Sequence, residues 1–502
     1  MLRVGHLFGN APSFWTIVFL VVALGLALGF ECINGFHDTA NAVATVIYTN
    51  TLRPWMAVVW SGLWNFLGVV LSNGAVAFGI VALLPVELVI HVGSAAGFAM
   101  VFSLLLAAVI WNFSTWFLGI PASSSHTLIG SIVGVGLMNA FLAKQPFGDG
   151  VNWAKLQDTF AALLISPVIG FIGAALLFLL LKFLIRNPEL YRAPEGDKPP
   201  VWWVRCMLVL TCTGVSFAHG SNDGQKGMGL IMLILIGILP GVYAINPHVG
   251  DAQYATLVSA GQSAAPILRS KAQTTTIAPA AAETALSAYL KSGAKADQTT
   301  FDALAYQNAQ IAVVIHSVPS IDKLQPKERK QLRTDVYLVG QAIGKMVKQG
   351  LFPKTDAAQL SAYKKELDDI TTFIPLWVKL AVAICLGLGT MVGWKRIVVT
   401  VGEKIGKAHM TYAQGMSAEV VAFATIELAD KLGLPVSTTH ILTSGVAGTM
   451  AANRSGLQYE TLRNIVLAWV LTVPACVFLG AGLFGAAFLL IFHATGVPVP
   501  PQ

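Results

Sequence analysis

The feature that most restricts the fold is the length of the stretches that contain no Asp, Glu, Lys or Arg. The longest runs from Leu88 to Ala143, and two others cover Thr159–Leu181 and Asn464–Gln502. About 20 apolar residues cross a bilayer as a helix, so the first stretch alone can cross it twice. Only 11% of the residues are charged, against roughly 25% in a soluble domain. The sequence predicts an all-α polytopic membrane protein with about 10 to 12 transmembrane segments.

The basic character of the chain fits loops at a membrane surface. The net charge is +7 and the pI is about 9.1. Basic residues between apolar runs are typical of membrane proteins, and no basic domain with interleaved aromatic residues indicates a nucleic-acid partner. The five cysteines lie in or beside apolar runs without metal-binding spacing, which favours small buried side chains. The lipid bilayer is the partner that the composition implies.

Changes in composition divide the membrane part into two halves. A polar, proline-rich linker separates them, and the second half is interrupted by a stretch rich in Ala, Gln, Thr, Lys and Asp that is too polar to span. Its periodicity predicts a soluble, mostly helical insertion. The expected units are a first membrane repeat at 14–186, the linker at 187–200, the start of a second repeat at 201–243, the insertion at 244–372, and the rest of the second repeat at 373–492.

Two polar motifs occur in the same order in both halves. An acidic motif around Asp38 is followed by Pro121-Ala-Ser-Ser-Ser-His126, and a second around Asp223 is followed by Pro435-Val-Ser-Thr-Thr-His440. The first apolar run, Phe14–Ile33, leads directly into the first acidic motif. Repeated halves with polar or broken segments at matching places are typical of secondary transporters. We therefore expect an inverted-repeat transporter in which some segments are discontinuous or re-entrant.

The proline-hydroxyl-histidine motifs predict an anion site. Proline is tolerated at a helix start, so the hydroxyls that follow lie at a helix N-terminus, where free N–H groups and the helix dipole favour an anion. The alternative is that Ser and Thr only cap helices or bond within the bundle, but two copies favour a site. The candidate substrate-binding residues are Ser123, Ser124, Ser125, Ser437, Thr438 and Thr439.

The acidic motifs predict a coupling ion. A carboxylate at membrane depth is costly, so Asp38, Asn41 and Asp223 are candidates to bind a cation or carry a proton. In the second copy, the residue three positions after Asp223 is Lys226 rather than Asn. An ammonium cannot ligate a cation, so Lys226 either neutralises Asp223 or contacts the substrate. This difference favours protons over sodium.

Other polar residues near these motifs have weaker signals. His126 and His440 either bind the anion or carry protons, or else fix the loop through a structural hydrogen bond. Further acidic residues lie in or near apolar runs, where some could face an interface instead; these are Glu31, Glu419, Glu427 and Asp430.

The sequence does not favour an enzyme. Ser125 and His126 are adjacent, so on a helix they point about 100° apart and are poorly placed as nucleophile and base. The chain has neither a Gly-x-Ser-x-Gly elbow nor a Walker loop, which are the usual motifs of serine hydrolases and of nucleotide-driven pumps.

The four motifs together resemble those of the inorganic phosphate transporter (PiT) family, most closely its bacterial low-affinity branch. The residues that carry this resemblance are Gly35-Phe-His-Asp-Thr-Ala-Asn41, Pro121–His126, His219-Gly-Ser-Asn-Asp-Gly-Gln-Lys-Gly227 and Pro435–His440. The resemblance implies a multi-pass protein of the bacterial inner membrane, commonly a homodimer. It places phosphate between the two Ser/Thr motifs, with Asp38, Asn41 and Asp223 in coupling. Residues with auxiliary roles would be His37, His126, Asn222, Lys226 and His440.

The expected function is therefore symport of inorganic phosphate with protons. Bringing one negative charge into a negative-inside cell costs about 2.3 kcal/mol per 100 mV, which a cotransported proton or metal removes. The resemblance implies transport of a neutral divalent metal–phosphate complex. We expect no resident cofactor and no preformed metal site of His and Cys, so Mg²⁺ would enter with phosphate. Alternatives are sulfate or arsenate as substrate, sodium coupling, or a membrane sensor with the insertion as its output domain.

Overall fold

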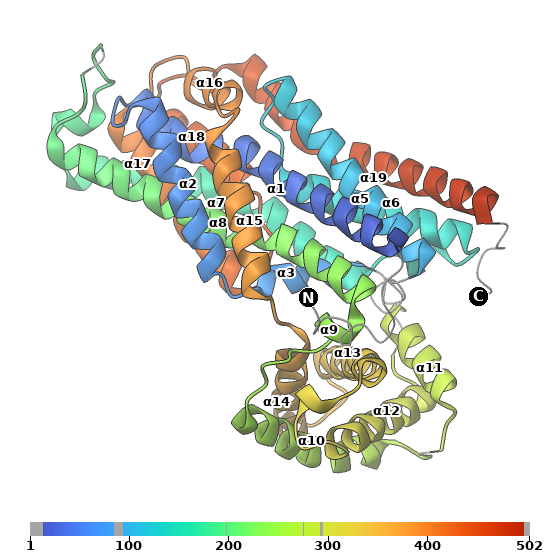
Figure 1. Ribbon diagram of the computed structural model, residues 1–502. Coiled ribbons are helices and arrows are strands. Elements are labelled where there is room, and N and C mark those ends of the chain that lie inside the picture. The colour runs from blue at the N-terminus through green and yellow to red at the C-terminus, as the bar shows by residue number, and fades with distance from the viewer. Residues whose placement is uncertain (1–13, 85–93, 197, 275, 292–294, 496–502) are drawn as a thin grey trace.

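The computed structural model describes residues 14–84, 94–196, 198–274, 276–291 and 295–495, and it leaves out a few further side chains, those of residues 39–41 among them. Its regular structure within these ranges is helical (Figure 1). The first half contains α1 (Phe14–Tyr48), α2 (Pro54–Leu71), α3 (Ala75–Val81), α5 (Ala95–Phe117), α6 (Ser124–Leu142) and α7 (Trp153–Leu184). The second half begins with α8 (Trp202–Ile238) and α9 (Pro240–Tyr243) and continues with α15 (Leu376–Met391), α16 (Lys395–Glu403), α17 (Tyr412–Lys431), α18 (Thr438–Ala452) and α19 (Tyr459–Thr495).

The insertion is a separate helical bundle below the membrane body (Figure 1). It consists of α10 (Asp251–Lys271), α11 (Pro279–Lys291), α12 (Gln298–His316), α13 (Pro326–Lys348) and α14 (Lys354–Thr371). These helices bury a hydrophobic core of their own, to which Leu286, Leu332 and Leu360 contribute. Three short 3₁₀ turns complete the described elements, at Phe147–Gly150, Pro188–Tyr191 and Ile321–Lys323.

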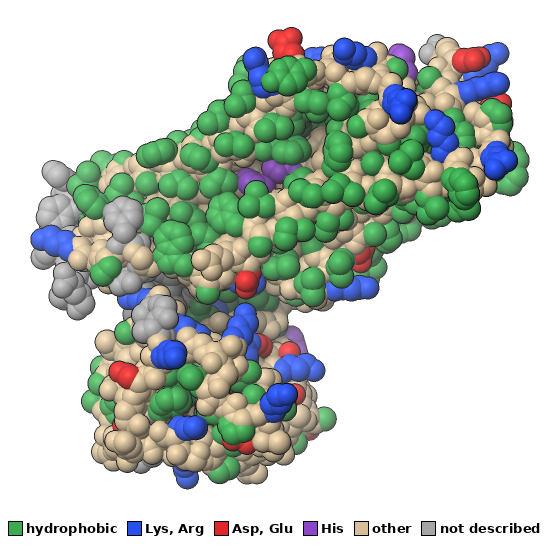
Figure 2. All heavy atoms as spheres, turned by 180° about the vertical axis from the view of Figure 1, so that it is seen from behind, with side chains coloured by type: hydrophobic (Ala, Val, Ile, Leu, Met, Phe, Trp, Pro, Cys, Tyr) green, Lys and Arg blue, Asp and Glu red, His purple; other side chains and the backbone are tan. Residues whose placement is uncertain are grey.

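Hydrophobic side chains cover the flank of the membrane body, whereas Lys and Arg gather at its end and over the insertion (Figure 2). Within the described residues, six helices are long and apolar enough to cross a membrane, and the pair α14 and α15, bent by 73°, is a seventh candidate. The exposed apolar side chains of α7, such as Leu164 and Leu176, face outward, as expected for contact with lipid. The chain is an all-α, multi-pass membrane protein.

The acidic motifs do not end their helices. The first apolar run was expected to stop at Ile33, but α1 continues through Asp38 to Tyr48, and α8 likewise continues through Asp223. Both carboxylates are buried: Asp38 accepts hydrogen bonds from α6 and α18, and Asp223 accepts one from Ser124 of α6 and pairs with Lys226 of its own helix. Because their charge is satisfied by tertiary partners, the backbone need not break to bring them to water.

The helices of the two halves pack across each other. In the first half α6 packs against α19 of the second, and α18 of the second half packs against α7 of the first. Glycines make this contact close: an added Cβ at Gly134 would lie 2.1 Å from the carbonyl oxygen of Val477, and one at Gly448 would lie 2.1 Å from that of Phe171. Backbone-to-backbone packing of this kind is typical of membrane helices. It places the N-termini of α6 and α18 inside the body.

Candidate functional site

The two proline-hydroxyl-histidine motifs adopt the same local structure. Each preceding helix ends at a glycine in the left-handed region, Gly119 with φ +67° and Gly433 with φ +64°, a conformation that other residues rarely adopt. The amides of Ile120 and Leu434 then bond back to a carbonyl of the ending helix, each at 2.9 Å. The sequence thus encodes two helix–loop–helix hairpins, α5 to α6 and α17 to α18.

The first hydroxyl of each motif caps the new helix. Ser123 Oγ accepts from the amide of His126 at 3.2 Å, and Ser437 Oγ accepts from that of His440 at 3.1 Å. This is the ordinary role of an N-cap serine. Among the six predicted substrate-binding hydroxyls, these two are therefore engaged with the backbone of their own helices.

The carboxylate of Asp38 joins the two motifs. Ser124 donates from the start of α6 to Asp38 Oδ2 at 2.6 Å, and Thr439 donates from the start of α18 to Oδ1 at 2.7 Å. All three side chains are at most 3% exposed. The structure thus brings hydroxyls from residues far apart in the sequence to one anionic group in the interior of the membrane body.

The second acidic residue is held differently. Lys226 Nζ lies 2.7 Å from Asp223 Oδ2 and donates to Ser124 Oγ at 3.2 Å. The Ser124 hydroxyl also lies 3.4 Å from Asp223 Oδ2. Both charged side chains are fully buried. Ser124 consequently contacts both acidic residues and the lysine, so the predicted residues from both halves form one cluster.

Two histidines border the carboxylates. His37 Nδ1 lies 3.1 Å from Asp38 Oδ1, and its Nε2 lies 3.2 Å from the hydroxyl oxygen of Thr115. Thr115 itself donates to the carbonyl of Trp111, at 3.0 Å, so it accepts from the histidine. On α8, His219 Nε2 lies 3.4 Å from Asp223 Oδ2.

His219 is positioned by a residue that the motifs did not include. Its Nδ1 lies 2.7 Å from the amide oxygen of Asn65 on α2. Asn65 and Thr115 were both missed from the sequence. Each is an isolated polar residue in an apolar run, which is a weak signal because such residues often bond only within the bundle.

The remaining predicted residues stabilise the loops or lie beside them. Ser125 donates to the carbonyl of Val436 at 2.6 Å, and Asn222 donates to that of Leu434 at 3.2 Å. Thr438 is 5% exposed, and its hydroxyl has no hydrogen-bond partner among the described residues. Asn41 lies on α1, but its side chain is outside the described part of the structure.

The rings of His126 and His440 lie together, with their centroids 4.6 Å apart. His440 also stacks on Trp469 of α19 at 4.0 Å, and His126 Nδ1 lies 2.9 Å from Ser123 Oγ. The described contacts of these two histidines are therefore with aromatic rings and a cap rather than with the acidic residues.

Three groups in the cluster can face one cation. One ligand atom each from Asp38, His219 and Asp223 lies within 4.8 Å of the other two. The sequence predicts no preformed metal site built from His and Cys. This group differs from such a site because it consists of two carboxylates and one imidazole. Carboxylates and imidazole are ligands for divalent metals such as Mn²⁺ and Zn²⁺. The ammonium of Lys226 beside Asp223 competes with a cation there.

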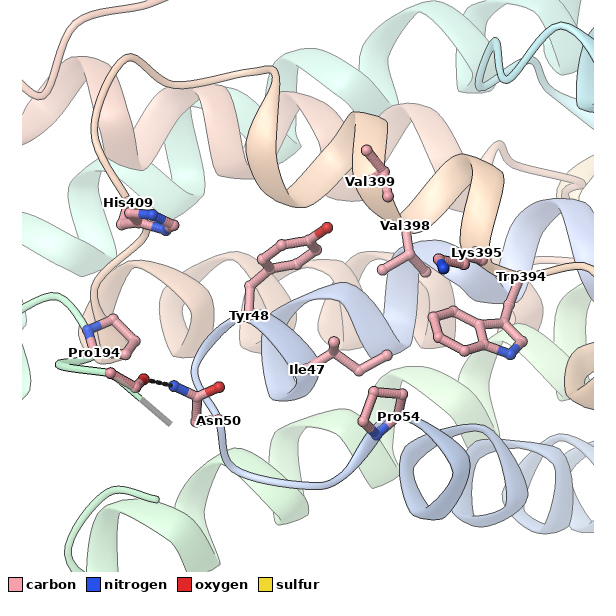
Figure 3. A pocket seen from close by; sticks show the side chains of 11 residues that line it. Ile47, Tyr48, Asn50, Pro54, Pro194, Trp394, Lys395, Val398, Val399 and His409 are labelled. Atoms are coloured by element: carbon pink, nitrogen blue, oxygen red, sulfur yellow. Dashed lines mark hydrogen bonds between the residues drawn. The ribbon is translucent and has the colours of Figure 1, made fainter. Parts of the chain in front are cut away.

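A cavity of about 520 Å³ opens at the end of α1 (Figure 3), and α16, which lines it, lies at the end of the body opposite the insertion (Figure 1). Figure 3 shows Tyr48 of α1 between Val398 of α16 and His409, while Asn50 lies beside Pro194 and donates to the carbonyl of Gly196 at 2.6 Å. Thr45, one turn before Tyr48, donates to the buried carboxylate of Glu419. The cavity thus lies at the same end of α1 as Glu419, a buried acidic residue of α17.

Comparisons with known proteins identify the family. Residues 34–480 match the phosphate transporter family. The low-affinity inorganic phosphate transporter PitB of Escherichia coli (strain K12) is 41% identical over 493 residues, covering 95% of this chain and 98% of that protein. The low-affinity inorganic phosphate transporter PitA of the same strain is 42% identical over 498 residues, with the same coverage.

A solved structure has the same fold. The protein named the sodium-dependent phosphate transporter matches with a TM-score of 0.52 and 20% sequence identity, covering 94% of this chain and 100% of that one. The resemblance that the four motifs indicated is confirmed by the family match and by the two relatives. The chain belongs to the phosphate transporter family and is a transporter rather than an enzyme.

Proposed function

We propose that this protein imports inorganic phosphate across the bacterial inner membrane by proton symport, with phosphate bound between the N-termini of α6 and α18. The observation that carries the proposal is that Ser124 and Thr439 donate to a single carboxylate, that of Asp38. Hydroxyl donors that converge on one carboxylate can also bind a tetrahedral oxyanion such as phosphate. The relatives PitA and PitB are named as phosphate transporters, which supports phosphate as the substrate.

The geometry also supports coupling to a positive charge. A phosphate dianion and an ionised Asp38 repel each other strongly when both are removed from water. Phosphate can take the hydroxyl donors of Ser124 and Thr439 only if Asp38 is protonated or a cation enters as well. Phosphate binding is thereby linked to the uptake of a proton or a metal ion.

The histidine contacts favour a proton. His37 and His219 each have a carboxylate oxygen at one ring nitrogen and another hydrogen-bond acceptor, Thr115 or Asn65, at the other. A neutral imidazole carries only one N–H. Each imidazole thus lies between a carboxylate and a second oxygen atom, a position from which it can exchange a proton with the carboxylate during coupling.

A divalent metal can accompany phosphate as cargo. Asp38, His219 and Asp223 are the residues that would face it, and the metal would neutralise the phosphate dianion. Lys226 would then move away from Asp223 or remain as the positive partner of phosphate itself. We include the neutral metal–phosphate complex as a form of the substrate.

We further propose that the two halves are repeats of inverted topology. The helices with the acidic motifs run in opposite directions: α1 ends at the cavity of Figure 3, whereas α8 begins next to it, after Pro194 and Gly196, and leads to α9 beside the insertion. The crossed pairs α6–α19 and α18–α7 have the reciprocal packing expected of such repeats. The family resemblance also implies that the protein is a homodimer, which light scattering in detergent would test.

Radiolabelled phosphate uptake into proteoliposomes tests the function. We expect uptake under an inward proton gradient, increased by Mg²⁺ if the metal complex is carried. Uptake that follows a sodium gradient alone would contradict proton coupling. Competition by sulfate or arsenate at the same concentration as phosphate measures selectivity, and absence of uptake under every gradient would contradict phosphate transport.

A further inference from the structure

A second buried acidic residue lies on α1, seven residues before Asp38. Glu31 is 0% exposed; its carboxyl oxygens make no hydrogen bond of ordinary geometry among the described residues, and the polar groups beside them are the Asn34 amide and the backbone of Gly227. Seven residues correspond to two helical turns, so Glu31 lies on the same face of α1 as Asp38, about 10 Å along the axis. It is not part of the proposed phosphate site.

The carboxyl group of Glu31 fits against a glycine of α8. A Cβ added at Gly227 would lie 2.3 Å from Glu31 Cγ and 2.5 Å from its Oε1. Such distances are far below van der Waals contact, so a side chain larger than hydrogen at this position would displace the carboxyl group. Gly227 directly follows Lys226, which places Glu31 beside the Asp223–Lys226 pair.

A buried amide lies beside this carboxyl group. Asn34, one turn after Glu31 on the same face, is 0% exposed; its amide lies beside the Glu31 carboxyl group, and neither amide atom makes a hydrogen bond of ordinary geometry among the described residues. Buried polar groups without partners are rare and costly. A buried carboxyl group and amide in such loose contact can rearrange when the carboxyl group gains or loses a proton.

The charged groups that act on Glu31 come from α8. Lys226 directly precedes the glycine against which the carboxyl group lies, and Asp223 is one turn earlier on the same helix. The neighbouring helix α5 has no charged residue, and on α15 the cation Lys379 bonds to the carbonyl of Ser72 instead. Lys226 is therefore the cation that Glu31 can pair with when it is ionised.

We propose that Glu31 carries the transported proton and competes with Asp223 for Lys226, an inference that rests on the proposed proton coupling. With Glu31 protonated, Lys226 stays on Asp223 and Ser124, as the structure shows. When the Glu31 O–H bond breaks, the proton leaves to water on the release side and the carboxylate keeps the electron pair. Lys226 then shifts toward Glu31.

This shift links proton release to phosphate release. The ammonium of Lys226 contacts Ser124, one of the two hydroxyls that converge on Asp38. Moving a positive charge away from a bound anion in a low-dielectric interior weakens binding. Protonation of Glu31 on the entry side returns Lys226 to Asp223 and restores the site. Asn34 lies between Glu31 and Asp38 along α1 and can bond the protonated carboxyl group during the exchange.

Glu31→Gln tests the role of this residue, because glutamine keeps the shape of the side chain but cannot release a proton. In proteoliposomes, net phosphate uptake driven by a proton gradient should fall by tenfold or more. Exchange of external radiolabelled phosphate for internal phosphate needs no net proton release and should stay within twofold of wild type. The dependence of net uptake on internal pH should disappear. Glu195→Gln in the exposed linker is the matched control and should leave both rates unchanged.

Three outcomes would overturn the assignment. Wild-type net uptake by Glu31→Gln would show that another group carries the proton. Loss of exchange together with net uptake would show that Glu31 supports the phosphate site or the fold. A change from proton to sodium dependence in the variant would assign the carboxyl group to cation selection. If wild type itself lacks proton-driven uptake, the proposed coupling fails independently of Glu31.

Gly227→Ala provides a second variant that keeps the carboxyl group. Its methyl group would displace Glu31 from its position, so net uptake should again fall more than exchange. Equal loss of both rates in Gly227→Ala, with thermal stability unchanged, would contradict the proposal.

Discussion

Hydroxyl groups hold the acidic residue of the first half, whereas a lysine holds that of the second. Asp38 accepts from Ser124 and Thr439, at 2.6 and 2.7 Å, and Asp223 pairs with Lys226 at 2.7 Å. Hydroxyls can be shared with an arriving oxyanion, but a buried lysine cannot be left without a negative partner at small cost. Asp38 is therefore the carboxylate that responds to substrate, while Asp223 holds the positive charge of Lys226 whenever Glu31 is protonated.

Replacing Asp38 should give the largest loss of transport. In Asp38→Asn, the amide nitrogen cannot accept a hydroxyl hydrogen, so one of the two bonds that join α6 to α18 is lost, and this side chain can no longer be protonated to make room for the charge of phosphate. We expect proton-driven phosphate uptake to fall about a hundredfold or more. Thermal unfolding in detergent should change much less, and a large fall in the melting temperature would instead assign Asp38 a structural role.

Replacing Asp223 should lower the stability of the protein more than replacing Asp38 does. Asp223→Asn leaves Lys226 buried without its ion-pair partner, which typically costs about 3–5 kcal/mol. We expect low yield and a lower melting temperature. The double variant Asp223→Asn/Lys226→Met removes the stranded charge and should recover most of the stability but not the transport. If the double variant is no more stable than the single one, Lys226 is not the source of the defect.

Removing the hydroxyl groups of Ser124 and Thr438 should lower the affinity for phosphate. Ser124 contacts both acidic residues, and the Thr438 hydroxyl has no partner among the described residues. A hydrogen bond to a charged group contributes about 1.5–3 kcal/mol, so Ser124→Ala/Thr438→Ala should raise the phosphate concentration for half-maximal uptake by about tenfold to a hundredfold. Ser131→Ala is the control, because Ser131 donates to the carbonyl of Thr127 in its own helix. Equal effects of the pair and the control would remove both hydroxyls from the site.

The motifs and the fold class could be predicted because polar residues are conspicuous in apolar runs. Asp38 and Asp223 are costly at membrane depth, and the second Pro-hydroxyl-His string indicated that the first was part of a site. The sequence could not separate Ser123 from Ser124, because a helix start uses serine both as cap and as donor. Only the contacts assign Ser123 to the backbone and Ser124 to the carboxylates.

Other features depend on packing between distant segments. Glu31 ends an apolar run, where the sequence is equally consistent with an interfacial carboxylate, and only its contact with Gly227 places it in the interior. The continuation of α1 beyond Ile33 depends on partners for Asp38 that come from α6 and α18. Such contacts have no local signal, because the residues that make them are separated by much of the chain.

The insertion is a further difference between the halves, since it interrupts the second half alone. Within it, burial raises the pKa of Asp335 to about 6, although Gln307 and Gln331 donate to its carboxylate and favour the charged form. A raised pKa in the folded state means that this group stabilises the fold fully below about pH 4 and loses that contribution as the pH rises through about 6. A pKa that is higher by about two in the folded state than in the unfolded state corresponds to a stability contribution of about 3 kcal/mol at most.

Asp335→Asn should therefore remove a pH dependence without affecting transport. In the wild-type protein, hydrogen-exchange protection of α12 and α13, corrected for intrinsic exchange rates, should be lower at pH 7.5 than at pH 5. The asparagine variant should show a smaller difference, and Asp251→Asn, at an exposed position on α10, should show the wild-type difference. Phosphate uptake should stay within twofold of wild type, because the described hydrogen bonds and ion pairs of the cluster involve no insertion residue. A larger loss of uptake in Asp335→Asn would mean that the insertion influences the membrane site, and the asymmetry between the halves would then extend beyond Lys226.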